Sequence, residues 1–216
     1  MMRTGLTTLF FSFIPATLAL FLLAPSISNA KTLTVTETSS GSAAQVPIDL
    51  DGKNCGQING VTSCPADSGL GTGGGSSRGG PDQGSFTFQV VTESVPAPGT
   101  GCSFAPASIQ SCPIGSVTDG CLFNYVGGNG VTRYDTNGDL AISALTSGTI
   151  CFNLDAGLPY SFEAQTQWMY VGGTGNLANA SGSYTNTTTG QVLQNDPQGH
   201  GMAWFTAKNK GTLTVP

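Results

Sequence analysis

The chain has 216 residues, of which only 9% are charged, against about 25% in an average soluble domain. Its 31 glycines and 12 prolines disfavour helices, which argues against a helical bundle, a coiled coil or a polytopic membrane protein. Seven basic residues against twelve acidic ones give a net charge of −5, and this excludes the basic surface that nucleic-acid binding requires. The composition therefore predicts a small, weakly charged β protein.

Residues 1–30 have the layout of a signal peptide. Arg3 is their only charge, a long apolar run follows it, and Ser28-Asn29-Ala30 forms a small-x-small cleavage site. We expect cleavage after Ala30 and a secreted, periplasmic or cell-surface protein. The alternative is an N-terminal membrane anchor, which the polar interruptions of the apolar run disfavour. No later stretch reaches the roughly 18 apolar residues of a membrane span, so we expect none in the mature chain.

All six cysteines follow the predicted cleavage site, and an even number in an oxidising compartment favours disulfides. Two pairs bracket short loops, Cys55 with Cys64 and Cys102 with Cys112. Cys121 and Cys151 would then remain, on two predicted strands that could be neighbours. The connectivity stays open, since six cysteines allow many pairings. With no CxxC and a single histidine, His200, we expect neither a metal site nor a cofactor.

Alternating apolar and polar residues predict short strands along the rest of the chain. These strands cover 32–38, 85–93, 121–126, 130–135, 139–146, 148–154, 159–171, 183–193, 201–208 and 212–215. Glycine-containing turn signals at 127–130, 137–138 and 147–148 separate several of them. We count about eight to ten strands in a strongly antiparallel order. We expect residues 31–216 to form one antiparallel β-barrel with long Gly/Pro/Cys-rich loops, because closure into a barrel removes exposed sheet edges.

The segment 69–84, GLGTGGGSSRGGPDQG, is dominated by glycine and serine. A phosphate-binding loop is one interpretation, because a bare GxGxxG occurs in it. The segment lacks GxxxxGK[ST] and has no strand-to-helix context, so we expect a flexible surface loop.

Two stretches resemble a known family. Residues 170–183, YVGGTGNLANASGS, resemble the GGTG-x-[FL]-x-x-A-x-G signature of the allene oxide cyclase and dirigent barrels. Residues 138–151, from GDL to GTIC, resemble an element upstream of that signature in secreted bacterial relatives. Together the matches span roughly 102–183, and 31–84 carries no recognisable motif.

The resemblance implies a small antiparallel barrel of about eight strands, similar to a lipocalin in outline, that holds side chains or one small ligand. Its relatives include cyclases and dirigent proteins, which steer reactive hydrophobic intermediates and are commonly oligomers, trimers especially. We interpret the signature as shaping one end of the barrel, because no helix follows it to bind phosphate. The residues with this shaping role are Gly172, Gly173, Thr174, Gly175, Leu177, Ala180 and Gly182.

The strand predicted at 159–171 carries the candidate site. One of its faces is aromatic, and either core packing or an apolar ligand pocket would use that face. Its other face is polar; if that face pointed inward, Glu163 could act as an acid in a wet cavity. The candidate pocket residues are Tyr160, Phe162, Trp168, Tyr170 and Trp204.

The sequence thus predicts a binding barrel for a small hydrophobic molecule rather than an enzyme. One alternative is a cyclase or isomerase that folds a reactive substrate inside the barrel. Another is a structural or adhesive protein of the cell surface. A continuous cavity lined by Tyr160, Phe162 and Trp168 would favour binding or catalysis, whereas a filled barrel would favour the structural class.

Overall fold

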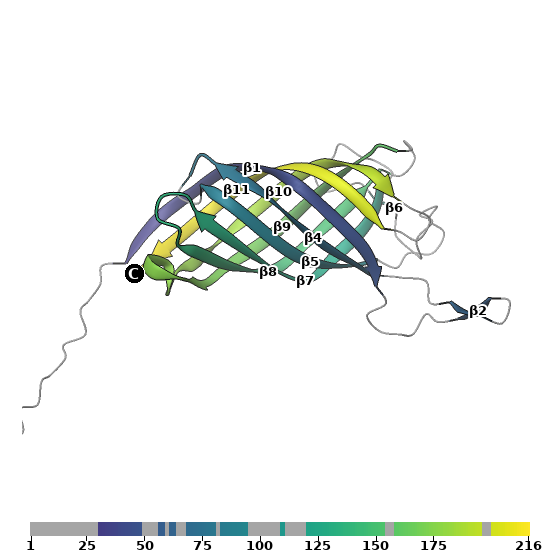
Figure 1. Ribbon diagram of the computed structural model, residues 1–216, viewed down its shortest axis with the longest axis horizontal. Coiled ribbons are helices and arrows are strands. Elements are labelled where there is room, and N and C mark those ends of the chain that lie inside the picture. The colour runs from purple at the N-terminus through teal and green to yellow at the C-terminus, as the bar shows by residue number, and fades with distance from the viewer. Residues whose placement is uncertain are drawn as a thin grey trace, which may run out of the picture.

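The computed structural model describes residues 30–48, 56–58, 61–63, 68–80, 83–94, 109–110, 120–153, 158–195 and 200–216. Strands make up nearly all of this part (Figure 1). They are β1 (Lys31–Ile48), β2 (Gly56–Ile58), β3 (Val61–Ser63), β4 (Ser68–Arg78), β5 (Gly84–Ser94), β6 (Ile109–Gln110), β7 (Gly120–Tyr134), β8 (Leu140–Phe152), β9 (Tyr160–Gly173), β10 (Ser181–Asn195) and β11 (Gly201–Val215). A single 3-10 turn, η2 (Gly175–Leu177), joins β9 to β10.

The eight long strands close into an antiparallel barrel. Each of them pairs with the next along the chain, from β1 through β4, β5, β7, β8, β9 and β10 to β11, and β11 pairs back with β1. The pairing of β5 with β7 completes the ring, while β6 adds a short pairing to β7 and β2 pairs only with β3. The predicted single β-barrel is confirmed. Closure of this kind leaves no unpaired sheet edge in the ring.

Strands are longer than the turn signals predicted. The glycines at 127–130 lie inside β7, where the register shifts beside Val126, and Ser147-Gly148 lies at a register shift inside β8. Both segments were expected to be turns, but both lie within a long strand, each beside a bulge, at Val126 in β7 and at Thr146 in β8. The turn at 137–138 is confirmed: Gly138 has a φ of +77° between β7 and β8.

The glycine-rich tract is a strand, so the prediction of a flexible loop over 69–84 is wrong. Residues 68–78 form β4, paired with β1 on one side and β5 on the other. Its glycines are needed because the neighbours come close. A Cβ on Gly75 would lie 2.0 Å from the carbonyl oxygen of Ser40, and one on Gly73 would lie 2.7 Å from the ring of Phe88. Small residues here make room for aromatic rings inside the barrel.

Side chains alternate between the two faces of the barrel wall. In β1 the buried positions include Val35, Glu37 and Ser39, and threonines and serines occupy the exposed positions between them. A hydrophobic cluster fills the end of the barrel beside η2, which we call the plug end. Its buried members are Val35, Tyr134, Ala141, Tyr170, Leu177, Ala180 and Leu213. We call the opposite end, where β1 finishes and β11 begins, the rim end.

The two stretches that carry the family resemblance contact each other at the plug end. The backbone N–H of Leu140 donates to the hydroxyl of Thr174 at 2.9 Å, and that of Asn176 donates to the carboxylate of Asp139 at 3.1 Å. Leu177 and Ala180 are both in the buried cluster. Gly172, Gly175 and Gly182 have φ values of +134°, +53° and +124°, which favour glycine. The signature therefore lies at one end of the barrel, and its role in shaping that end stays a prediction.

Several predictions fall on parts of the chain that the structure does not describe. The signal peptide is one of them, and the side chains of Cys55, Cys64, Cys102, Cys112 and Cys121 are others. Cys121 pairs in register with Phe152, and Cys151 with Leu122. The two cysteines therefore lie on neighbouring strands, as expected, but are not opposite each other. The disulfide pairing stays a prediction.

Candidate functional site: the barrel cavity

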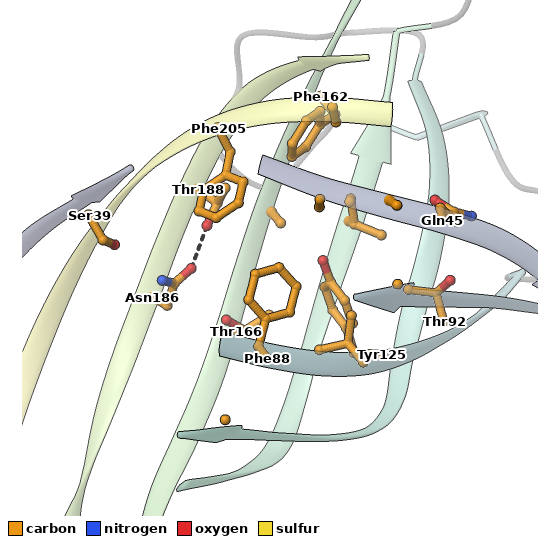
Figure 2. Close-up of a pocket in the computed structure, with 18 of the residues that line it drawn as sticks. Ser39, Gln45, Phe88, Thr92, Tyr125, Phe162, Thr166, Asn186, Thr188 and Phe205 are labelled. Carbon is orange, nitrogen blue, oxygen red and sulfur yellow. Dashed lines mark hydrogen bonds between the residues drawn. The ribbon is translucent and has the colours of Figure 1, made fainter. Parts of the chain in front are cut away.

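A cavity of about 230 Å³ lies inside the barrel, between the plug end and the rim end. All eight long strands contribute side chains to its wall, and Figure 2 shows rings of Phe88, Tyr125 and Phe205 beside it. Near the rim end its lining reaches Pro47, Gly69 and Asn195. The aromatic residues that line it are Phe86, Phe88, Phe123, Tyr125, Phe152, Tyr160, Phe162, Trp168, Tyr184 and Phe205.

The rings form two contacting groups toward the rim end. Phe205 of β11 lies 5.8 Å from Phe88 and 6.2 Å from Phe86, between ring centroids, across the glycines of β1 and β4. Phe152 contacts Phe123 at 5.7 Å and Phe162 at 5.8 Å. Edge-to-face and tilted contacts of this kind hold rings in fixed orientations. The resulting wall is apolar and suits a flat or aliphatic ligand.

A row of polar side chains crosses the cavity wall nearer the plug end. In register, Glu37 of β1 stands opposite Asn209 of β11, Asn209 opposite Asn186 of β10, and Asn186 opposite Thr166 of β9. All four line the cavity. We call Glu37, Asn209, Asn186 and Thr166 the polar row.

Hydrogen bonds fix this row. The hydroxyl of Thr188 donates to Oδ1 of Asn186 (dashed in Figure 2), and Nδ2 of Asn186 donates to Oδ1 of Asn209 at 2.7 Å. The indole N–H of Trp168 donates to the hydroxyl of Thr166 at 2.8 Å. Polar groups held in this way keep one orientation and can discriminate between ligands.

Two tyrosines that line the cavity have phenol pKa values above the usual range. Burial raises the pKa of the Tyr125 phenol well above its usual value of 10.0, and it raises the pKa of Tyr160 as well. Desolvation is the cause in both cases, because it disfavours the charged phenolate. These hydroxyls are therefore neutral hydrogen-bonding groups at physiological pH.

The pocket residues predicted from the sequence lie in three different parts of the barrel. Tyr160, Phe162 and Trp168 line the cavity. Tyr170 lies on the same face of β9, but it packs in the plug-end cluster instead, 5.1 Å from Tyr184. Trp204 is 42% exposed and neighbours the buried Phe205, so strand alternation places it on the outer face of β11. Trp204 is therefore corrected from a pocket residue to a surface residue.

Glu163 does not meet the condition on which its candidate role depended. The aromatic face of β9 points into the barrel, so the polar face points outward. Glu163 is only 1% exposed, and its register partner on β8, Cys151, is fully buried beside it. It is a buried carboxyl of the outer wall rather than a cavity acid.

The acid that does line the cavity is Glu37, which sequence reasoning missed. Its side chain is 4% exposed, and a Cβ on Gly80 would lie 2.9 Å from its Oε1, so Gly80, just after β4, covers the carboxyl group. The sequence does contain a signal for Glu37. It lies two residues after Val35 and four after Leu33, and this spacing places its carboxyl group on the apolar face of a strand.

The described part of the chain holds no group of three or more His, Cys, Asp or Glu that could bind a metal ion. None of its helices is long and apolar enough to cross a membrane.

In comparisons with known proteins, no family model, no curated protein and no solved structure matches the chain.

Proposed function

We propose that the protein is a secreted, disulfide-stabilised barrel that binds a small hydrophobic molecule in its cavity. One observation carries the proposal. Tyr160, Phe162 and Trp168 line an unfilled space inside the barrel, whereas a protein with a purely structural role would gain stability by filling it. An apolar cavity with a few fixed polar groups is the usual form of a small-molecule site.

The resemblance to the allene oxide cyclase and dirigent barrels supports this proposal, since those barrels hold reactive hydrophobic molecules. It also supports an oligomer, a trimer especially, as the state of the secreted protein. The contact between Asp139 and the 174–176 segment gives the two resembling stretches a shared structural purpose. Cleavage after Ala30 and oxidation of the six cysteines belong to the same proposal.

Native mass spectrometry of the protein secreted by its own host tests these points together. We expect a chain that begins at Lys31, lacks six hydrogen atoms because its six cysteines are oxidised, and carries a small molecule. A chain that retains residues 1–30 or free thiols contradicts secretion or disulfide bonding. A protein that carries no small molecule and takes up none from an added panel of apolar compounds contradicts the binding function.

A second candidate function is cyclisation or isomerisation of a reactive substrate. The observation that favours it is the carboxyl group of Glu37 in the cavity wall, because a cavity acid can transfer protons. The test is to let an unstable epoxide of an unsaturated fatty acid cyclise with and without the protein. An enantiomerically enriched product supports the enzyme, and a racemic one contradicts it.

A further inference from the structure

The cavity has polar side chains at its rim end that are separate from the polar row. Gln45 of β1, Thr92 of β5 and Tyr125 of β7 line it there, and we call them the rim group. Nε2 of Gln45 and Oγ1 of Thr92 lie 2.5 and 2.9 Å from the point that a Cβ on Gly69 would occupy. Thr92 pairs in register with Tyr125, and such pairs on one face of a sheet are neighbours. Three strands thus bring an amide and two hydroxyl groups together.

The rim group has hydrogen-bonding capacity that the described part of the chain does not use. The hydroxyl of Thr92 donates to the carbonyl oxygen of Gly69 at 3.3 Å. The amide of Gln45 and the hydroxyl of Tyr125 make no hydrogen bond to any described residue. Burial raises the pKa of Tyr125, so its phenol stays protonated and can donate as well as accept. A buried polar group without a partner is costly, so a ligand that supplies partners here is favoured.

A second set of polar side chains lies deeper in the cavity. Ser39, Asn186, Thr188 and Asn209 line it there, and we call them the inner group. Thr188 donates to Asn186, and Asn186 donates to Oδ1 of Asn209. Ser39 is 6% exposed and pairs with Ala207, the register neighbour of Thr188. The hydroxyl of Ser39 and the amide nitrogen of Asn209 make no hydrogen bond to a described residue, so both can bind a ligand.

Phenylalanine rings separate the two groups. Figure 2 shows Phe88 and Phe205 between Ser39 on one side and Gln45 on the other. A Cβ on Gly41 would lie 3.0 Å from Cζ of Phe205, so this ring lies against the middle of β1. Ser39 and Gln45 are six positions apart on β1, which is about 20 Å along the strand and about 15 Å along the axis of a barrel with tilted strands. A cavity of about 230 Å³ drawn out over that length is narrow and suits one extended chain.

We propose that the cavity selects an extended apolar molecule with a hydroxyl or carbonyl oxygen at each end, one against the inner group and one against the rim group. This rests on the proposed binding function and names its ligand class. The hydrocarbon between the two oxygens lies along the phenylalanine rings, out of water. Each end exchanges its hydration for hydrogen bonds with amides and hydroxyls. A molecule with one apolar end leaves one of the two groups without partners, which weakens its binding.

Two isomeric diols test the proposal by calorimetry with the oxidised protein at pH 7. 1,10-Decanediol has a hydroxyl at each end and is about as long as the two groups are apart, whereas 1,2-decanediol has both hydroxyls at one end. The isomers have the same composition, so apolar burial favours neither strongly. We expect 1,10-decanediol to bind about tenfold more tightly, as one or two further hydrogen bonds allow. Equal affinities, or tighter binding of 1,2-decanediol, overturn the inference. This ranking needs no variant, so no folding defect can obscure it.

Three variants locate the two ends of the ligand. Tyr125→Phe removes a hydroxyl of the rim group, and Ser39→Ala removes one of the inner group. We expect each to weaken the binding of 1,10-decanediol by about threefold or more. Tyr134→Phe is the matched control and should leave the affinity unchanged, because the buried hydroxyl of Tyr134, also on β7, belongs to the plug-end cluster and not to the cavity lining. A loss in only one of the first two variants, or an equal loss in the control, overturns the inference.

A third probe separates failure of the inference from failure of the binding function. 1-Decanol has the same chain with a single hydroxyl. If it binds and neither diol does, the inference is overturned while the binding function stands. If none of the three probes binds, and no compound of the apolar panel does either, the binding function is contradicted and the inference with it.

Discussion

The carboxylate of Asp139 occupies the space that a side chain at position 175 would need. A Cβ on Gly175 would lie 2.0 Å from Oδ1 of Asp139, and the φ of Gly175 is +53°. The same carboxylate accepts hydrogen bonds from Nδ2 of Asn137 at 2.7 Å and from the backbone of Asn176 at 3.1 Å. This contact joins the β7–β8 turn to η2 and holds the plug end in place.

Gly175→Ala should therefore lower the free energy of unfolding by about 1–3 kcal/mol, because a left-handed backbone and a displaced carboxylate both cost stability. Urea unfolding followed by circular dichroism measures it. Gly127→Ala is the matched control, since nothing lies within 4 Å of a Cβ there; its effect should stay within about 0.5 kcal/mol. Equal losses in the two variants would contradict the role given to the Asp139–Gly175 contact.

Within β4, two glycines should respond differently to the same substitution. Gly75→Ala brings a Cβ within 2.0 Å of the backbone oxygen of Ser40, whereas Gly71→Ala meets a methyl group of Val90 at 3.2 Å. We expect the first to lose about 1–3 kcal/mol by overpacking and the second less than about 1 kcal/mol. Chemical unfolding of both variants checks this. A fully stable Gly75→Ala protein would mean that β4 is not packed in the barrel wall as described.

Adjacent residues of β11 separate the inner wall from the outer surface. Phe205 contacts Phe86 and Phe88 inside the barrel, while Trp204 is exposed outside it. Phe205→Ala should cost about 3 kcal/mol in unfolding free energy, near the lower end for a buried phenylalanine because a cavity already borders the ring. Trp204→Ala should change it by only about 0.5 kcal/mol. Thermal and urea unfolding give both values, and the reverse order would show that the two faces of β11 are assigned wrongly.

The buried tyrosines predict how stability depends on alkaline pH. Burial raises the folded-state pKa of Tyr125 and Tyr160 above the usual tyrosine value of 10.0. Below pH 10 these tyrosines are protonated in both the folded and the unfolded protein, so the free energy of unfolding has its full value. Above pH 10 the unfolded chain loses these protons while the folded protein keeps them, so the free energy of unfolding falls as pH rises. Absorbance at the tyrosinate band should show at least one of the five tyrosines, Tyr125, titrating only as the protein unfolds. Full titration near pH 10 in the folded state would contradict their burial.

The alternation of apolar and polar residues made the barrel predictable from the sequence, but one strand of its wall, β4, could not be predicted in this way. Tyr160, Phe162 and Trp168 could be placed on one face of one strand because apolar and polar side chains alternate along most of β9. β4 could not be found in this way. Its inward positions 69, 71, 73 and 75 are glycines, which carry no hydrophobic signal. Glycine is needed there because aromatic rings of neighbouring strands lie close, and the sequence of β4 does not show that.

The candidate site was predicted only in part, for a related reason. Alternation shows which residues share a face of a strand, but it does not show which face of β9 points inward. The hypothesis that Glu163 is a cavity acid depended on which face that is. Glu37 shares a face with Leu33 and Val35, so its inward position was readable. Its register with Asn209 and Asn186 was not, because long-range pairing of β1 with β11 carries no local signal.

The most direct test of the cavity is contact quenching of its tryptophan. The chain has two tryptophans: Trp168 lines the cavity and Trp204 lies on the outer face. Trp204→Phe therefore leaves one reporter inside, and Trp168→Phe leaves one outside. Both are titrated with 4-bromobenzyl alcohol, whose bromine quenches an indole only at close range. We predict saturable quenching with one site per chain for the inner reporter, and only weak, non-saturating quenching for the outer one. Non-saturating quenching of both would contradict a ligand-binding barrel.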